Sequence, residues 1–170
     1  ARPISRYGEY MNTSNSLRYF LYARKSTDDL ARQVRSIEDQ IAEIRELAQR
    51  LSLHIVDVLI EKQTAKIPGR PVFNEMLARI EGGEADGIVA WHPDRLARNS
   101  LEGGKLIYLL DIQKIKDLKF ATYQCDPNAQ GKLSLAIAFG LSKYYVDNLS
   151  ENILRGKRQK VKNGLWPGWA

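Results

Sequence analysis

Short apolar runs rich in β-branched and aromatic residues alternate with longer stretches of helical periodicity, and this alternation limits the possible folds of the chain more than any other feature. The runs that predict strands are 18–24, 53–60, 88–91 and 118–124. Between them, apolar residues recur every three or four positions, as they do on the buried face of a helix. Strands that alternate with helices usually pair in parallel. The chain therefore predicts an α/β fold with a mostly parallel central sheet of about four or five strands and helices on both faces.

The expected helices have recognisable first residues. Ser36 followed by Asp39 has the spacing of an amino-terminal capping box. Pro71 is a favoured first helical residue, because the N–H that it lacks would have no helical partner there. Asn99 or Ser100 can cap the helix that follows the third strand. These positions predict a helix after each of the first three strands.

The last helical stretch differs from the others in its length. From 133 to about 162 there is no proline, and apolar residues recur every four positions, at Ile137, Leu141, Tyr145, Leu149 and Ile153. This pattern predicts one long C-terminal helix. Its distal half extends beyond its own domain and therefore needs a partner, either a second subunit or DNA.

These elements divide the chain into four expected segments. Residues 1–16 form an irregular leader, and residues 17–132 form the α/β core. Residues 133–163 form the long helix, which we expect to serve oligomerisation and DNA contact. Residues 164–170 begin a further DNA-binding domain that is cut off.

The charge of the chain favours a polyanionic partner. Its 26 lysines and arginines outnumber its 20 acidic residues, so the formal net charge is +6. Basic residues crowd the end of the long helix, at Arg155, Lys157, Arg158, Lys160 and Lys162. We expect these five to contact double-stranded DNA, although a run of charges on a helix is about as often a solvated face.

Few residues are available for other kinds of site. The single cysteine, Cys125, excludes an internal disulfide and a cysteine-rich zinc site, and it fits an intracellular, reducing compartment. The two histidines, His54 and His92, are too few for a metal cluster or a histidine–aspartate–serine triad. No apolar run approaches the ~18 residues that a membrane helix needs, so we expect a soluble protein without a membrane partner.

Polar residues suited to phosphate chemistry follow two of the predicted strands. Ser26 comes just after the first strand, and Asp94 comes just after the third. Parallel sheets usually bind ligands at the carboxyl ends of their strands. A hydroxyl among guanidinium groups suits attack on a phosphate, because the planar fork of arginine can bind two phosphate oxygens. The arginines expected in loops or first helical turns beside this serine are Arg24, Arg70, Arg95 and Arg98. Each alone would more often be a solvated charge, but together they predict a phosphate site.

In combination, these motifs resemble one family of enzymes. The chain reads Tyr-x-Arg-x-Ser-Thr at 22–27, Ser-x-x-x-Gln at 36–40, Gly-Arg-Pro at 69–71 and Asp-Arg-Leu-x-Arg at 94–98. It resembles the catalytic domain of the serine recombinases, the resolvase and invertase group, and is most similar to the large integrase and transposase branch. The resemblance spans about residues 17–162.

The resemblance implies a mechanism of DNA strand transfer. Ser26 would attack a DNA phosphate, form a 5′-phosphoserine linkage and release a 3′-hydroxyl, and rejoining would need no metal, ATP or other cofactor. Gln40 and Asp94 would orient groups around the phosphate, with Tyr22 in support. The residues that would bind the phosphate and stabilise its developing charge are Arg24, Arg70, Arg95 and Arg98.

The resemblance also implies an assembly and a cellular setting. Family members act as homodimers on each DNA site and as a tetramer in the synaptic complex. They are cytoplasmic, nucleoid-associated proteins of bacterial or phage-encoded mobile elements. One position departs from the small resolvases, which carry a Glu-Arg pair on the long helix where this chain reads Tyr145-Val146. Those two roles are not carried over, and the segment 143–152 is instead similar to the large serine recombinases.

Two other functions are compatible with the sequence. On the same fold, the chain could be a non-catalytic DNA-binding or assembly module that acts through its basic terminal helix. It could also be a small α/β phosphohydrolase or a phosphate-binding regulator, although the metal carboxylates or glycine-rich loop of such proteins are not evident. Covalent capture of DNA on Ser26 separates the recombinase from both.

Overall fold

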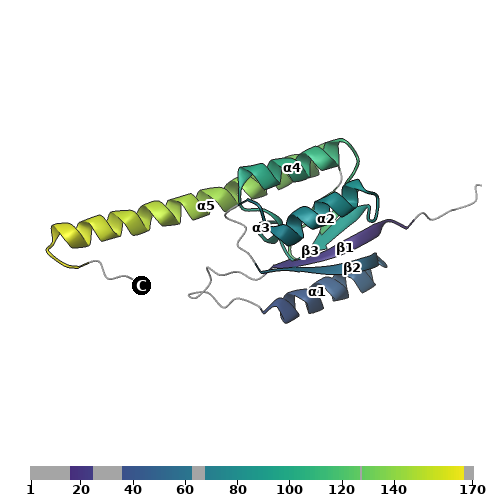
Figure 1. Ribbon diagram of the computed structural model, residues 1–170, viewed down its shortest axis with the longest axis horizontal. Helices are drawn as coiled ribbons and strands as arrows, with labels where there is room; N and C mark the ends of the chain where they lie inside the picture. The colour runs from purple at the N-terminus through teal and green to yellow at the C-terminus, as the bar shows by residue number, and fades with distance from the viewer. Residues whose placement is uncertain (1–15, 25–35, 63–67, 127, 167–170) are drawn as a thin grey trace, which may run out of the picture.

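Four parallel strands form the central sheet of the protein (Figure 1). The computed structural model describes residues 16–24, 36–62, 68–126 and 128–166. The strands lie in the order β2-β1-β3-β4, and each neighbouring pair is parallel. Their bounds are Arg18–Arg24 for β1, His54–Glu61 for β2, Gly87–Ala90 for β3 and Asp117–Phe120 for β4. The expected parallel sheet of an α/β fold is therefore confirmed.

Helices cover both faces of this sheet. In Figure 1, α1 lies on one side of the strands, and α2 and α4 lie on the other. The helices are α1 (Ile37–Arg50), α2 (Pro71–Glu81), α3 (Pro93–Leu96), α4 (Ser100–Asp111) and α5 (Ala129–Lys162).

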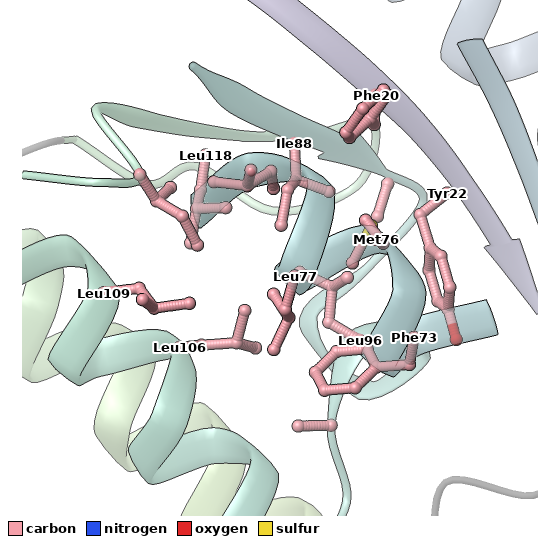
Figure 2. Packing of buried hydrophobic residues seen from close by; sticks show 14 of the residues in the cluster. Phe20, Tyr22, Phe73, Met76, Leu77, Ile88, Leu96, Leu106, Leu109 and Leu118 are labelled. Atoms are coloured by element: carbon pink, nitrogen blue, oxygen red, sulfur yellow. The ribbon is translucent and has the colours of Figure 1, made fainter. Parts of the chain in front are cut away.

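The two faces of β1 belong to two separate hydrophobic clusters. Leu21 packs with Ile44 and other residues of α1. Phe20 and Tyr22, which alternate with it along the strand, point to the opposite face and meet Phe73 of α2 and its neighbours (Figure 2). Because both faces are covered, β1 is a buried central strand, as its unbroken apolar run predicts.

The predicted helix starts are confirmed. The backbone N–H of Asp39 donates to Ser36 Oγ over 3.1 Å, and the N–H of Ser36 donates back to Asp39 Oδ2 over 3.2 Å, which completes the capping box. Asn99, rather than Ser100, caps α4: its Oδ1 accepts from the N–H of Glu102 over 2.8 Å.

Two local predictions were wrong. The fourth strand ends at Phe120 instead of extending to residue 124, because its neighbour β3 ends at Ala90, the partner of Phe120. The short helix α3 at Pro93–Leu96 was not expected, since four residues are too few to show a helical period.

The long helix α5 begins at Ala129, four residues earlier than predicted, because Asn128 caps it through a 2.7 Å bond from the N–H of Gly131. Its first turns pack on α4 and place Leu135 and Phe139 in the core. Beyond them the helix runs away from the sheet (Figure 1). Apolar residues remain exposed along α5 at Leu133, Ile137, Leu141, Leu149 and Ile153.

Among the described residues, no helix has the length and apolar character needed to cross a membrane.

Candidate active site

The predicted site lies where the strand order of the sheet reverses. The chain leaves β1 toward β2 at one edge of the sheet, and it leaves β3 toward β4 at the other edge. Such a switch point is where open α/β sheets bind their ligands. Arg24 is the last residue of β1, and the segment 91–99 follows β3 directly. Ser26 and Thr27, which follow Arg24 along the chain, lie outside the described residues.

Asp94 is the centre of a charged cluster at this point. Its Oδ2 lies 2.9 Å from Arg98 Nη2, and its Oδ1 lies 3.7 Å from Arg95 Nε. His92 Nδ1 lies 3.0 Å from the same Oδ1. Burial by itself would raise the pKa of Asp94, but the contact with His92 and the charges of Arg95 and Arg98 hold that pKa well below its usual range. The carboxylate therefore stays ionised and orients two arginines.

Arg24 joins this cluster from β1. Its Nη2 lies 3.4 Å from the carbonyl oxygen of Asp94, and its Nε lies 3.4 Å from that of Arg95. Burial, and then the positive charges of Arg98, Arg95 and Arg70, lower the pKa of Arg24 to about 10. An anion placed among these guanidinium groups would relieve their mutual repulsion.

Arg70 lies close to this cluster, and its guanidinium contacts protein groups. It is the N-cap residue of α2, and its Nη1 donates to Tyr22 Oη over 2.8 Å. Its Nη2 lies 2.7 Å from Glu102 Oε2. Burial raises the pKa of Tyr22 against the opposing charge of Arg70, so Tyr22 keeps its proton. Binding of a phosphate by Arg70 stays a prediction.

The expectation that all four motif arginines lie in loops or first helical turns was wrong for Arg24, which is the last residue of β1. The side chains of Arg24, Arg70 and Arg95 are buried. Arg98 is 12% exposed. Burying several cations at one end of a sheet is costly unless each has partners, and the partners here are acidic groups and carbonyl oxygens.

Gln40 is buried on the first turn of α1. Glu43, one turn later, accepts a 2.6 Å hydrogen bond from Trp91 Nε1 at the end of β3. The guanidinium carbon of Arg95 lies 5.4 Å from the centre of the Trp91 ring. This contact chain connects α1 to the segment that carries Asp94.

Two buried acids near the site were missed by the sequence analysis. Glu61, the last residue of β2, accepts from the backbone N–H of Val72 over 3.1 Å and of Phe73 over 3.3 Å, so it holds the start of α2. Glu102 pairs with Arg70. The Asn99-x-x-Glu102 spacing of a capping box was a signal for Glu102, whereas nothing in the sequence indicated the partners of Glu61.

The basic residues predicted to bind DNA are exposed along the distal part of α5. They are Arg155, Lys157, Arg158, Lys160 and Lys162.

Within the part of the chain that the structure describes, no group of three or more His, Cys, Asp or Glu side chains could hold a metal ion.

The sequence profile of the family described as "Resolvase, N terminal domain" matches residues 19–166, nearly the whole chain. The chain belongs to the resolvase family. The resemblance to serine recombinases inferred from the motifs is thereby confirmed.

A relative and two solved structures agree with this assignment. A protein of Bacillus subtilis (strain 168) described as "Putative DNA recombinase" is 26% identical over 147 residues, which are 85% of this chain and 28% of that protein. This resolvase-family chain thus spans less than a third of the relative.

Among solved structures, the N-terminal catalytic domain of TP901-1 integrase is 22% identical, with a TM-score of 0.56 over 76% of this chain and 97% of that chain. A resolvase family site-specific recombinase from Streptococcus pneumoniae is 21% identical, with a TM-score of 0.57 over 86% of this chain and 99% of that chain. At this identity, both similarities show the resolvase-like fold.

Proposed function

We propose that this chain is the catalytic domain of a site-specific DNA recombinase that cleaves and rejoins DNA through a 5′-phosphoserine intermediate. The observation that carries the proposal is the cluster of Arg24, Arg95 and Arg98 around Asp94, at the switch point of the sheet. Ser26 follows Arg24 by two positions in the sequence. The membership of the resolvase family supports the same reaction class.

In the proposed reaction, Ser26 Oγ attacks a DNA phosphorus atom and loses its proton. The bond from phosphorus to the 3′ oxygen breaks, and that oxygen leaves as a 3′-hydroxyl after it takes up a proton. A 3′-hydroxyl of another strand then attacks the phosphorus of the phosphoserine and loses its proton. The bond from phosphorus to Ser26 Oγ breaks, Ser26 takes up a proton, and a phosphodiester is restored. Because one phosphate ester replaces another in each step, the balance requires no ATP.

The buried arginines would stabilise the charge on the non-bridging oxygens. Arg98 and Arg95, held by Asp94, present guanidinium groups beside Arg24. Since its pKa is lowered to about 10, Arg24 gives up a proton more readily than an ordinary arginine, although it is charged at neutral pH. The charge of the guanidinium groups would supply the stabilisation that other enzymes obtain from a metal ion. We therefore propose that no metal or other cofactor is needed. Gln40 would orient the segment that carries the serine.

We propose that α5 serves assembly and DNA contact. Its exposed apolar residues, spaced one or two turns apart, suit packing against a second copy, as in homodimers that join into a tetramer on DNA. Its basic distal turns suit the phosphates of double-stranded DNA. Residues 17–128 would then form the catalytic core and residues 129–163 the assembly helix of a cytoplasmic, nucleoid-associated recombinase.

The test is covalent capture of DNA. The protein is incubated with double-stranded fragments from the genomic region that flanks its own gene, and trapped peptides are mapped by mass spectrometry. We expect an adduct on Ser26, complete loss of it in Ser26→Ala, and retained DNA binding by that variant. Ser100→Ala is the matched control, because Ser100 is an exposed helical residue that lies outside the charged cluster, and it should form the adduct normally.

Each other outcome rejects the proposed mechanism. An adduct that persists in Ser26→Ala would exclude Ser26 as the nucleophile. DNA binding without any adduct in the unaltered protein would favour the non-catalytic DNA-binding or assembly module.

A further inference from the structure

The guanidinium of Arg70 is occupied by protein groups from three elements. Its Nε and Nη2 form a bidentate pair with Glu102 of α4, at 3.3 Å to Oε1 and 2.7 Å to Oε2. Its Nη1 donates to Tyr22 Oη of β1, and its Nη2 donates to the carbonyl oxygen of Leu96 at the end of α3. The guanidinium carbon lies 4.3 Å from the centre of the Phe73 ring. The side chains of Arg70 and Glu102 are only 1% and 4% exposed.

Glu102 also contacts Asn99, the N-cap residue of α4. Its Oε2 accepts a 2.7 Å hydrogen bond from Asn99 Nδ2, while its backbone N–H donates to Asn99 Oδ1 over 2.8 Å. The segment from Leu96 to Asn99 is thus held at both ends: Arg70 binds the carbonyl oxygen of Leu96, and Glu102 binds the side chain of Asn99.

Arg98 lies inside this segment. Its guanidinium reaches back to Asp94, with 2.9 Å between Nη2 and Oδ2. The direction in which Arg98 points therefore depends on the path of the backbone between α3 and α4. The buried pair of Arg70 and Glu102 ties this path to α2 and β1.

We propose that Glu102 and Arg70 are positioning residues for strand transfer: their ion pair fixes the segment 96–99 so that Arg98 faces the DNA phosphate, and Arg70 does not itself bind that phosphate. This inference rests on the function proposed above. Two observations carry it. The charge of Arg70 is already balanced by a buried carboxylate, and four hydrogen bonds direct its guanidinium to protein groups.

Three variants separate positioning from phosphate binding. Arg70→Met leaves Glu102 buried without its counter-charge, which is the most damaging way to break a buried pair. Glu102→Gln has the same shape and keeps an acceptor for Asn99. The double variant R70M/E102Q leaves no buried charge, so it removes the penalty of an unpaired carboxylate, although the contact of Arg70 with Leu96 is still lost. Glu84→Gln is the matched control, because Glu84 pairs with Arg79 over 2.8 Å at the surface.

The first readout is the rate at which the phosphoserine adduct forms on the flanking-DNA fragments described above. We expect Arg70→Met to lower the rate about 100-fold, the size of effect that a small misplacement of a reacting group produces. Glu102→Gln should lower it about tenfold. The double variant should be at least about tenfold faster than Arg70→Met, and Glu84→Gln should react like the unaltered protein. Because Glu102→Gln leaves Arg70 in place, a Glu102→Gln protein that reacts as fast as the unaltered one overturns the inference.

The second readout is hydrogen exchange of the backbone amides of residues 97–100, and it requires no catalysis. We expect faster exchange in Glu102→Gln and no change in Glu84→Gln. Glu102→Gln decides whether or not the double variant folds. Slower cleavage with faster exchange supports positioning, whereas unchanged or faster cleavage overturns it. If the unaltered protein forms no adduct, the proposed function fails. The exchange readout does not depend on that result. If the amides of residues 97–100 exchange at the same rate in Glu102→Gln as in the unaltered protein, the pair of Arg70 and Glu102 does not hold the segment 96–99.

Discussion

Two adjacent glycines in α4 test how the long helix packs on the core. Gly103 and Gly104 both lie inside α4, so alanine at either position should gain about 1 kcal/mol of helix stability. Their surroundings differ. A Cβ at Gly103 would lie 3.1 Å from Phe139 Cδ2 and 3.3 Å from Phe139 Cβ and Cγ, whereas nothing lies within 4 Å of a Cβ at Gly104. Phe139 belongs to α5 and is buried.

The expected effects follow from this difference. Gly104→Ala should raise the free energy of unfolding by about 1 kcal/mol and the Tm by about 2–4 °C. Gly103→Ala has the same helical gain, but it must displace the ring of Phe139, and overpacking of a core costs about 1–3 kcal/mol. We therefore expect Gly103→Ala to be less stable than Gly104→Ala by about 1–3 kcal/mol.

Urea denaturation followed by circular dichroism measures the two free energies, and calorimetry gives the two Tm values. A Phe139→Leu background provides the control, because a smaller side chain at 139 should reduce the penalty of Gly103→Ala and leave the effect of Gly104→Ala unchanged. Equal stabilisation by the two glycine substitutions in the unaltered protein would refute the packing of α5 against α4 at Phe139.

Two further predictions concern the charged residues. Asp94→Asn should make stability less sensitive to acid: the folded-state pKa of Asp94 is held below its usual range, so the unfolded state binds the extra proton, and the unaltered protein loses stability as the pH falls through about 4 and below. Urea midpoints at neutral and acidic pH measure this, and an equal loss in both proteins would contradict the role of Asp94. Neutralising four basic residues of α5 should reduce the slope of log K for DNA against log salt concentration by up to about 3.6, at about 0.9 for each lost phosphate contact. Filter binding across a salt series measures this slope, and an unchanged slope would show that these residues do not contact DNA. The four residues are Arg155, Lys157, Arg158 and Lys160.

The secondary structure was predictable wherever neighbouring residues decide it. The capping box of Ser36 and Asp39 and the cap at Asn99 involve groups three positions apart, and both are confirmed. The end of β4 was not predictable in this way, because β3 ends at Ala90 and offers no further strand partner beyond Phe120.

The sequence by itself determined which edge of the sheet carries the residues of two motifs. Once strands and helices alternate, the parallel order brings the end of β1 and the residues after β3 to one edge of the sheet, and the motifs at 22–27 and 94–98 identify the family. This much depends on distances along the chain, which a sequence displays directly.

Only the tertiary structure decided the state of the charges. It buries Arg24 among three other arginines, which lowers its pKa to about 10, and it pairs Arg70 with Glu102, 32 positions away. Hydrogen bonds, desolvation and Coulomb forces depend on distances in space. No local pattern around Arg70 distinguishes a guanidinium that is open to a phosphate from one that is already bound to a buried carboxylate.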